Sequence, residues 1–303
     1  MANHGMRGAS MKHMSRPTHA GDLLQWWVRA RGGPACIGID PVFERLPTQV
    51  RGADPVRSIE KWTLELLESV QPFAAAVKFQ SACFERWGSA GVAALERCLA
   101  AARGEFLVIL DWKRGDIGVS SEHYAAAASG PLRCDFVTAS PYLGADGFDS
   151  FLKAGLGVFG LVRTSNASGD AIQSQRLADG TSVAEMVGAF TKQCGAAHCG
   201  ESGWSSLGAV VGATKSTDAA ALRTQLPQTP FLVPGFGAQG GALDDVMACF
   251  DHRGQGALVT ASRSVIYAHE TSPGSWRDAV SEAAKLLRDQ LAEAVADRVK
   301  VHA

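Results

Sequence analysis

Eight short apolar segments separated by longer amphipathic stretches constrain the fold more than any other feature of this sequence. Most are continuous apolar runs, as expected for parallel strands that are covered on both faces. The expected strands are Ala35–Ile39, Ala74–Phe79, Phe106–Asp111, Asp135–Thr138, Gly157–Val162, Gly208–Val211, Pro230–Val233 and Ala257–Thr260. The expected helices include Ser58–Val70, Val92–Ala102, Ser182–Cys194, Thr217–Gln225 and Ser275–Val299.

This alternation predicts an α/β protein that forms a single-domain (β/α)8 TIM barrel. No G-x-G-x-x-G follows the first strand, so the signature of a dinucleotide-binding open sheet is missing. We expect the barrel domain to span residues 21–303, with an extended connection at about residues 164–206 between the fifth and sixth strands. Residues 1–20 lack the apolar core of a secretory signal, and we expect them to be a disordered leader or a non-native addition.

Composition narrows the possible partners and compartment. The net charge of −1 gives no global field to recruit nucleic acid or a membrane surface, and no apolar run approaches the roughly 20 residues of a membrane span. Seven cysteines without a C-x-x-C pair, an odd number in a large chain, favour a reducing, cytoplasmic location. Cys194, His198 and Cys199 are poorly spaced and lack a nearby fourth ligand, so we predict no metal site.

Charged residues gather where the first three strands end, which is where barrel enzymes place their active sites. Asp40 follows the first strand, Lys78 lies at the end of the second, and Asp111, Lys113 and Asp116 follow the third. A D-x-K-x-x-D pattern alone is compatible with a surface ion pair. Its position after an apolar strand favours a catalytic array, in which alternating charges keep both lysines protonated and the carboxylates ionised.

The last two strand ends suggest a phosphate site. Glycines after the seventh strand expose backbone N–H groups, and a helix is expected to start nearby, as in the phosphate sites of many barrels. Arg263, just after the eighth strand, can bind a phosphate through two parallel hydrogen bonds, and Gln239 can add an amide donor. Tight turns alone would also explain the glycines, which are Gly235, Gly237, Gly240 and Gly241.

Together these segments resemble the orotidine 5'-phosphate decarboxylase family, and more narrowly its bacterial subgroup with a Lys-Arg-Gly-Asp-Ile core motif. The resemblance extends from about Cys36 to Ala268. It is carried by Gly38-Ile39-Asp40-Pro41, Val77-Lys78-Phe79-Gln80, Asp111-Trp112-Lys113-Arg114-Gly115-Asp116-Ile117-Gly118, Ala139-Ser140-Pro141-Tyr142-Leu143-Gly144, Thr164-Ser165-Asn166, Val233-Pro234-Gly235-Phe236-Gly237-Ala238-Gln239-Gly240-Gly241 and Ala261-Ser262-Arg263-Ser264-Val265-Ile266-Tyr267-Ala268.

The resemblance implies a cofactor-free conversion of orotidine 5'-phosphate to UMP and CO2 in de novo pyrimidine biosynthesis. Lys78, Asp111 and Lys113 would form the catalytic array, with Asp116 supplied by the partner subunit of a homodimer. Lys113 would donate a proton to C6, and Asp111 would lie beside the departing carboxylate.

The resemblance also implies a set of substrate-binding residues. Asp40 and Lys78 would hold ribose hydroxyls, Ser140 the pyrimidine edge, and Gln239 and Arg263 the 5'-phosphate. The family usually has a threonine soon after the position of Asp116, and here Ser120 is the candidate in its place. The full expected set is Asp40, Ser120, Ser140, Pro141, Gln239, Gly240, Ser262 and Arg263.

Two alternatives are compatible with parts of the sequence. Sugar-phosphate decarboxylases and hexulose-phosphate synthases carry the same D-x-K-x-x-D pattern, but they use Mg²⁺ and an open-chain sugar. The Ser140-Pro141-Tyr142 segment and the glycine-rich loop around Gln239 favour the nucleotide substrate. A catalytically inactive, nucleotide-binding barrel is the second alternative, and the complete set of charged residues argues against it.

Overall fold

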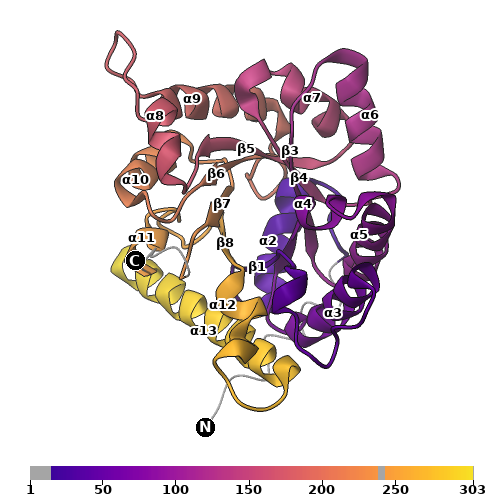
Figure 1. Cartoon of the computed structure of the whole chain (residues 1–303). Coiled ribbons are helices and arrows are strands. Elements are labelled where there is room, and N and C mark those ends of the chain that lie inside the picture. Colours follow the sequence, from indigo (N-terminus) through magenta and orange to yellow (C-terminus); the bar gives the residue numbers. More distant parts are fainter. Residues whose placement is uncertain (1–14, 238–242, 303) are drawn as a thin grey trace.

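The computed structural model describes residues 15–237 and 243–302, which form a closed barrel of eight strands surrounded by helices (Figure 1). The strands are β1 (Ala35–Ile39), β2 (Ala76–Gln80), β3 (Leu107–Arg114), β4 (Phe136–Ala139), β5 (Gly157–Arg163), β6 (Leu207–Val211), β7 (Phe231–Pro234) and β8 (Ala257–Ala261). The α-helices are α2 (Ala20–Arg31), α3 (Pro55–Val70), α4 (Ala82–Glu85), α5 (Gly88–Ala102), α6 (Gly118–Ser129), α7 (Asp146–Lys153), α8 (Asp170–Gln173), α9 (Val183–Gly195), α10 (Ser216–Gln225), α11 (Leu243–Met247), α12 (Arg263–Ile266) and α13 (Trp276–His302). Short 3-10 helices are η2 (Phe43–Arg45), η3 (Pro141–Leu143), η4 (Ala167–Gly169), η5 (Ala196–His198) and η6 (Ala268–Glu270).

The strands are parallel and pair in sequence order, and β8 pairs with β1 to close the barrel. Each expected strand overlaps an observed one, so the predicted (β/α)8 barrel is confirmed. Strands β1, β6 and β8 are buried along their whole length, because helices cover their outer faces and side chains fill the barrel.

Helix α3 illustrates how local sequence directs the outer layer. The Asp54 side chain accepts hydrogen bonds from two backbone N–H groups of the first turn, and Pro55 occupies a position where its missing N–H costs nothing. The apolar face expected from the sequence is buried, and it consists of Ile59, Trp62, Leu66 and Val70. No helix in the described part of the chain is both long and apolar enough to cross a membrane.

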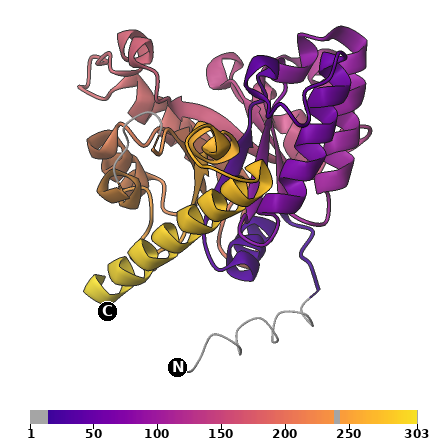
Figure 2. The same ribbon diagram turned by 60° about the horizontal axis from the view of Figure 1, so that its bottom comes forward.

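Helix α2, which we did not expect, closes the amino end of the barrel (Figure 2). Leu23, Leu24 and Trp27 are buried in one cluster with the side chains that fill the barrel, such as Phe136 and Phe159. Because apolar packing seals this end, a ligand can enter the barrel interior only from the carboxyl end of the strands.

Arg16, His19 and Ala20, which fall within the segment expected as a leader, contact the rest of the chain. Arg16 Nη2 pairs with Asp135 Oδ1 at 3.2 Å, and His19 Nε2 lies 3.0 Å from the carbonyl oxygen of His198. The side chain of His19 also caps α2, and Ala20 is buried. These contacts are mostly polar and long-range in sequence, so no local apolar pattern predicts them. The rest of the expected leader, residues 1–14, lies outside the described residues.

The connection between β5 and β6, residues 164–206, contains η4, α8, α9 and η5. A single bridge between Arg176 and Ser182 closes a projecting hairpin, and a capping box between Ser182 and Glu185 starts α9. The Gln173 side chain at the end of α8 accepts a hydrogen bond from Thr164 N at 2.9 Å. The connection is therefore tied to the residues that follow β5, at the carboxyl end of the barrel.

Candidate active site

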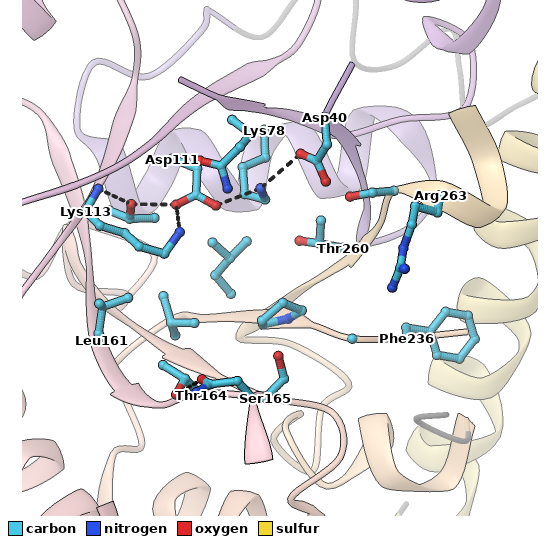
Figure 3. Close-up of a pocket in the computed structure, with 18 residues that line it drawn as sticks. Asp40, Lys78, Asp111, Lys113, Leu161, Thr164, Ser165, Phe236, Thr260 and Arg263 are labelled. Carbon is cyan, nitrogen blue, oxygen red and sulfur yellow. Dashed lines mark hydrogen bonds and ion pairs between the residues drawn. The ribbon is translucent and has the colours of Figure 1, made fainter. Parts of the chain in front are cut away.

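A pocket of about 280 Å³ opens at the carboxyl end of the strands (Figure 3). It is lined by Asp40, Lys78, Gln80, Asp111, Lys113, Thr138, Leu161, Thr164, Ser165, Asn166, Val210, Leu232, Pro234, Gly235, Phe236, Thr260, Ser262 and Arg263. These residues come from all eight strand ends and the loops that follow them, as in other barrel enzymes.

Four charged side chains from β1 to β3 form an alternating array in this pocket. Lys78 Nζ lies 2.8 Å from Asp111 Oδ2 and 3.8 Å from Asp40 Oδ1, and Lys113 Nζ donates to Asp111 Oδ1. Lys78 and Asp111 are buried, whereas the Lys113 side chain is 48% exposed. The array therefore leads from the barrel interior to an ammonium group that a ligand can reach.

Mutual pairing keeps the buried members of the array charged. Burial by itself would lower the pKa of Lys78, but the charges of Asp111 and Asp40 outweigh burial and raise that pKa. Burial would raise the pKa of Asp111, but the charges and hydrogen bonds of Lys78 and Lys113 hold it well below its usual range. A fixed carboxylate therefore stands between two amino groups at neutral pH.

Lys113 reaches the array from an irregular end of β3. The pairing of β3 with β4 shifts register there, and the Lys113 backbone has a φ of 51°, which is unfavourable for a residue with a side chain. Trp112 N and Lys113 N both donate to Thr138 Oγ1, at 3.0 and 2.9 Å. Thr138 in turn donates to Asp111 Oδ1 at 2.9 Å, so one hydroxyl group orients both catalytic candidates of β3.

Arg263 stands across the pocket from the array, at the start of α12 (Figure 3). Within the described residues its guanidinium has no hydrogen-bond or ion-pair partner, and the side chain is exposed. Ser262 precedes it and lies against β1, where a Cβ on Gly38 would clash with the Ser262 hydroxyl. Glycine at position 38 therefore lets the end of β8 approach the site closely.

The side of the pocket formed by β5 to β7 carries both apolar and polar side chains. Leu161, Val210 and Leu232 of β5, β6 and β7 line the pocket, as do Thr164 and Ser165, which follow β5. Leu161, Thr164 and Ser165 lie across the pocket from Lys78 and Asp40 (Figure 3). This arrangement can hold a flat heterocycle against aliphatic side chains while its edge faces the charged array and an anionic group faces Arg263.

The pocket gathers only part of the residue set expected from the sequence. Asp40, Lys78, Asp111, Lys113, Ser262 and Arg263 line it. Asp116, Ser120, Ser140 and Pro141 do not line it, and Gln239 and Gly240 lie outside the described residues. Asp116 instead accepts a hydrogen bond from Ile117 N at 2.9 Å, and Ser140 Oγ accepts one from Tyr142 N at 3.4 Å.

No group of three or more metal-ligating side chains occurs among the described residues, including the segment with Cys194, His198 and Cys199. All seven cysteines are free thiols in the structure.

Comparison with known proteins identifies the family of this chain. Residues 35–273 match the model of the orotidine 5'-phosphate decarboxylase / HUMPS family. The chain belongs to this family. The match includes all eight strands and every pocket residue, and it agrees with the range of about Cys36 to Ala268 that the sequence motifs indicated.

Relatives within the family match almost end to end. The orotidine 5'-phosphate decarboxylase of Rhodopirellula baltica is 35% identical over 286 residues, covering 86% of this chain and 94% of that protein. The orotidine 5'-phosphate decarboxylase of a Nocardioides species is 39% identical over 257 residues, covering 82% and 91%. The solved structure of Leishmania donovani OMP decarboxylase has a TM-score of 0.73 and 29% identity, covering 89% and 97%.

The sequence motifs did not predict some residues that shape the pocket. Thr138 ends an expected strand, but its hydrogen bonds to β3 depend on a register shift that periodicity does not encode. The apolar wall of Leu161, Val210 and Leu232 consists of strand residues whose facing direction follows only from the closed barrel. The signal that could have indicated them is their common position at or near strand ends.

Proposed function

We propose that this chain is an orotidine 5'-phosphate decarboxylase, a carboxy-lyase that forms UMP and CO2 in de novo pyrimidine biosynthesis. The observation that carries the proposal is the array of Asp40, Lys78, Asp111 and Lys113, placed across the pocket from Arg263. The names of its curated relatives, which match over most of their length, support this substrate in preference to a sugar phosphate.

Lys113 is the proposed proton donor. When the bond from C6 to the carboxylate breaks, CO2 leaves and the electron pair stays on C6. The Lys113 ammonium stabilises this charge and then transfers a proton, which forms the C6–H bond. The Asp111 carboxylate, held ionised by its lowered pKa, stands where the substrate carboxylate departs and keeps the ammonium in place. The proposed chemistry uses no metal ion or organic cofactor.

The proposed binding mode follows the two sides of the pocket. Asp40 and Lys78 bind ribose hydroxyls, and Arg263 binds the 5'-phosphate through its planar guanidinium together with Ser262. Gln239 and Gly240 are proposed to complete the phosphate site. Phosphate binding far from C6 supplies energy to order the loops around the array.

Ser140 and Pro141 are proposed to contact the pyrimidine edge in the liganded enzyme. Both are half-buried at the start of η3, which directly follows β4 and therefore borders the pocket. Among the described residues, Ser140 Oγ has only the 3.4 Å hydrogen bond from Tyr142 N to exchange for one to the substrate. Loop closure over a ligand commonly brings such residues into contact.

We also propose a homodimer in which Asp116 and Ser120 serve the active site of the neighbouring subunit. Neither residue lines the pocket of its own chain. The segments that follow β3 and β4 expose large apolar side chains, namely Ile117, Val119, Tyr142 and Leu143, which are 55%, 67%, 93% and 46% exposed. Exposed apolar side chains on segments that follow neighbouring strands are typical of a protein interface.

The proposal places the enzyme in the cytoplasm and gives it no nucleic-acid or membrane partner. Its seven cysteines are free, and the net charge of −1 provides no strong attraction to polyanions.

Decarboxylation of orotidine 5'-phosphate by the purified chain, followed by the loss of substrate absorbance, tests the proposal. We expect turnover that EDTA does not change and that falls by on the order of 10³-fold in Lys113→Ala. No turnover by the wild type, or near-native turnover by Lys113→Ala, would contradict it. EDTA-sensitive activity on a sugar phosphate would favour the other branch of the family, and tight UMP binding without turnover would favour the inactive barrel.

A further inference from the structure

The side chains of the two residues that flank Lys113 both donate hydrogen bonds to one carboxylate, which does not line the pocket. Trp112 Nε1 donates to Glu85 Oε1 at 3.0 Å, and Arg114 Nη2 donates to the same oxygen at 2.9 Å. Glu85 ends α4, the short helix that follows β2 and therefore the strand of Lys78. It does not line the pocket.

Aromatic packing extends this cluster to α6. The Arg114 guanidinium lies 4.9 Å from the ring centroid of Trp112 and 5.5 Å from that of Tyr124. The two rings meet edge to face, with centroids 5.4 Å apart. The Glu85–Trp112–Arg114 cluster thus links α4, the end of β3 and, through Tyr124, α6, and it holds the residues on both sides of Lys113.

The backbone at Lys113 needs such support. A positive φ at a residue with a side chain costs about 1 kcal/mol or more, and it persists only when the surroundings enforce it. On the inner side, Thr138 accepts hydrogen bonds from the backbone of Trp112 and Lys113. On the outer side, the side chains before and after Lys113 are both held by Glu85. The irregular strand end is therefore fixed from both faces.

We propose that Glu85 is a positioning residue for Lys113. By accepting hydrogen bonds from Trp112 and Arg114, it holds the end of β3 in the one conformation that directs the Lys113 ammonium to Asp111 (Figure 3). Its kinetic consequence rests on the proposed decarboxylase function, since it acts through the proposed proton donor.

Steady-state kinetics of Glu85→Ala, in the wild-type and Lys113→Ala backgrounds, tests this role. We expect kcat to fall by about 10- to 100-fold with KM changed less than about threefold, because displacement of a reacting group by about 1 Å lowers the rate by this order. Glu85→Gln keeps an acceptor oxygen and should recover most of the loss. In Lys113→Ala, the substitution should have no further effect, because no ammonium remains to be positioned.

Glu60→Ala is the matched control. Glu60 of α3 also binds one arginine, Arg97, on the outside of the barrel, but it lies away from the pocket and Lys113. Its kcat should equal that of the wild type. Trp112→Phe, which keeps an aromatic ring and removes only the donor to Glu85, replaces Glu85→Ala if that variant does not fold.

Two kinetic results would overturn the inference: a kcat for Glu85→Ala within twofold of wild type, or the same fold loss in both backgrounds. If the wild type does not decarboxylate orotidine 5'-phosphate, the proposed function fails separately, and crystal structures of the variants test the positioning. Lys113 displaced from Asp111 in Glu85→Ala but not in Glu60→Ala supports it, whereas an unmoved Lys113 overturns it.

Discussion

The two ends of the barrel both bury a cation, but they satisfy it in different ways. At the carboxyl end, Lys78 is paired with the carboxylates of Asp111 and Asp40, and its pKa is raised. At the amino end, Arg223 of α10 donates to three backbone carbonyl oxygens, at 2.9 Å for Thr229 and at 3.3 and 3.5 Å for the others. Its guanidinium also lies 4.1 Å from the Phe231 ring centroid, and burial lowers its pKa to about 10.

The buried Asp111 and the half-buried Asp135 show a similar contrast. Asp111 is held ionised by two lysines, whereas Asp135, just before β4, accepts from Val108 N at 2.8 Å, has only the partly exposed Arg16 as an ion-pair partner among the described residues, and has its pKa raised by burial. Backbone partners are fixed by the fold, so the amino-end charges lock the ends of strands together. Side-chain partners can be shared with a ligand, so the carboxyl-end charges remain available for chemistry.

Of the substitutions considered, removal of Lys78 should lower activity most, because it breaks the ion pairs at the carboxyl end of the barrel. In Lys78→Met, Asp111 loses one of its two ammonium partners, and we expect kcat/KM to fall by on the order of 10³-fold. The decarboxylation assay measures this loss. Arg223→Met is the matched control from the amino end, and its folded fraction should stay active. Equal losses in the two variants would contradict the functional contrast between the ends.

The carboxyl-end site should also depend on a second subunit. Lys113→Ala and Asp116→Ala should each retain only a small fraction of wild-type activity alone. After subunit exchange, random mixing restores about a quarter of the sites, because each hybrid dimer contains one site with both residues intact. Activity measured after mild unfolding and refolding of the mixture reports this gain. No gain, with hybrid dimers verified by mass spectrometry, would place Asp116 outside the neighbouring site.

At the amino end, the effect of a substitution should fall on stability. Arg223→Met leaves three backbone carbonyl groups without their buried donor, and we expect the free energy of unfolding to fall by about 2–4 kcal/mol. Urea titration measures the change, and kcat per folded molecule should stay within about twofold of wild type. A large loss of kcat at an unchanged free energy of unfolding would contradict a purely structural role of the amino end.

Asp111 and Asp135 should change the free energy of unfolding with pH by smaller amounts and in opposite directions. The pKa of Asp111 is lowered, so its stabilising contribution is complete above the unfolded pKa of roughly 3.9 and is lost as pH falls below it. The pKa of Asp135 is raised, so stability falls as pH rises from the unfolded pKa through the folded one. Unfolding free energies of wild type, Asp111→Asn and Asp135→Asn between pH 3 and 8 compare the two trends. If the two substitutions changed the pH dependence of the unfolding free energy in the same direction, the contrast between Asp111 and Asp135 would be wrong.

The sequence predicts the carboxyl end of the barrel better than the amino end. Apolar runs locate the strands, and Asp40, Lys78 and Asp111 stand at strand ends, so parallel closure alone brings them together. The amino end depends on contacts such as Arg16 with Asp135, 119 positions apart, which no local pattern records. The backbone of Lys113 escaped prediction for a related reason, because its register shift is set by pairing with β4.

Because Lys113 has a positive φ, thermal stability and catalytic activity favour different residues at this position. Glycine would relieve the backbone at no steric cost, so an optimisation that rewarded only thermal resistance would choose it and discard the amine. Engineering of this enzyme for heat tolerance should therefore leave residue 113 untouched and reinforce the surroundings that constrain it.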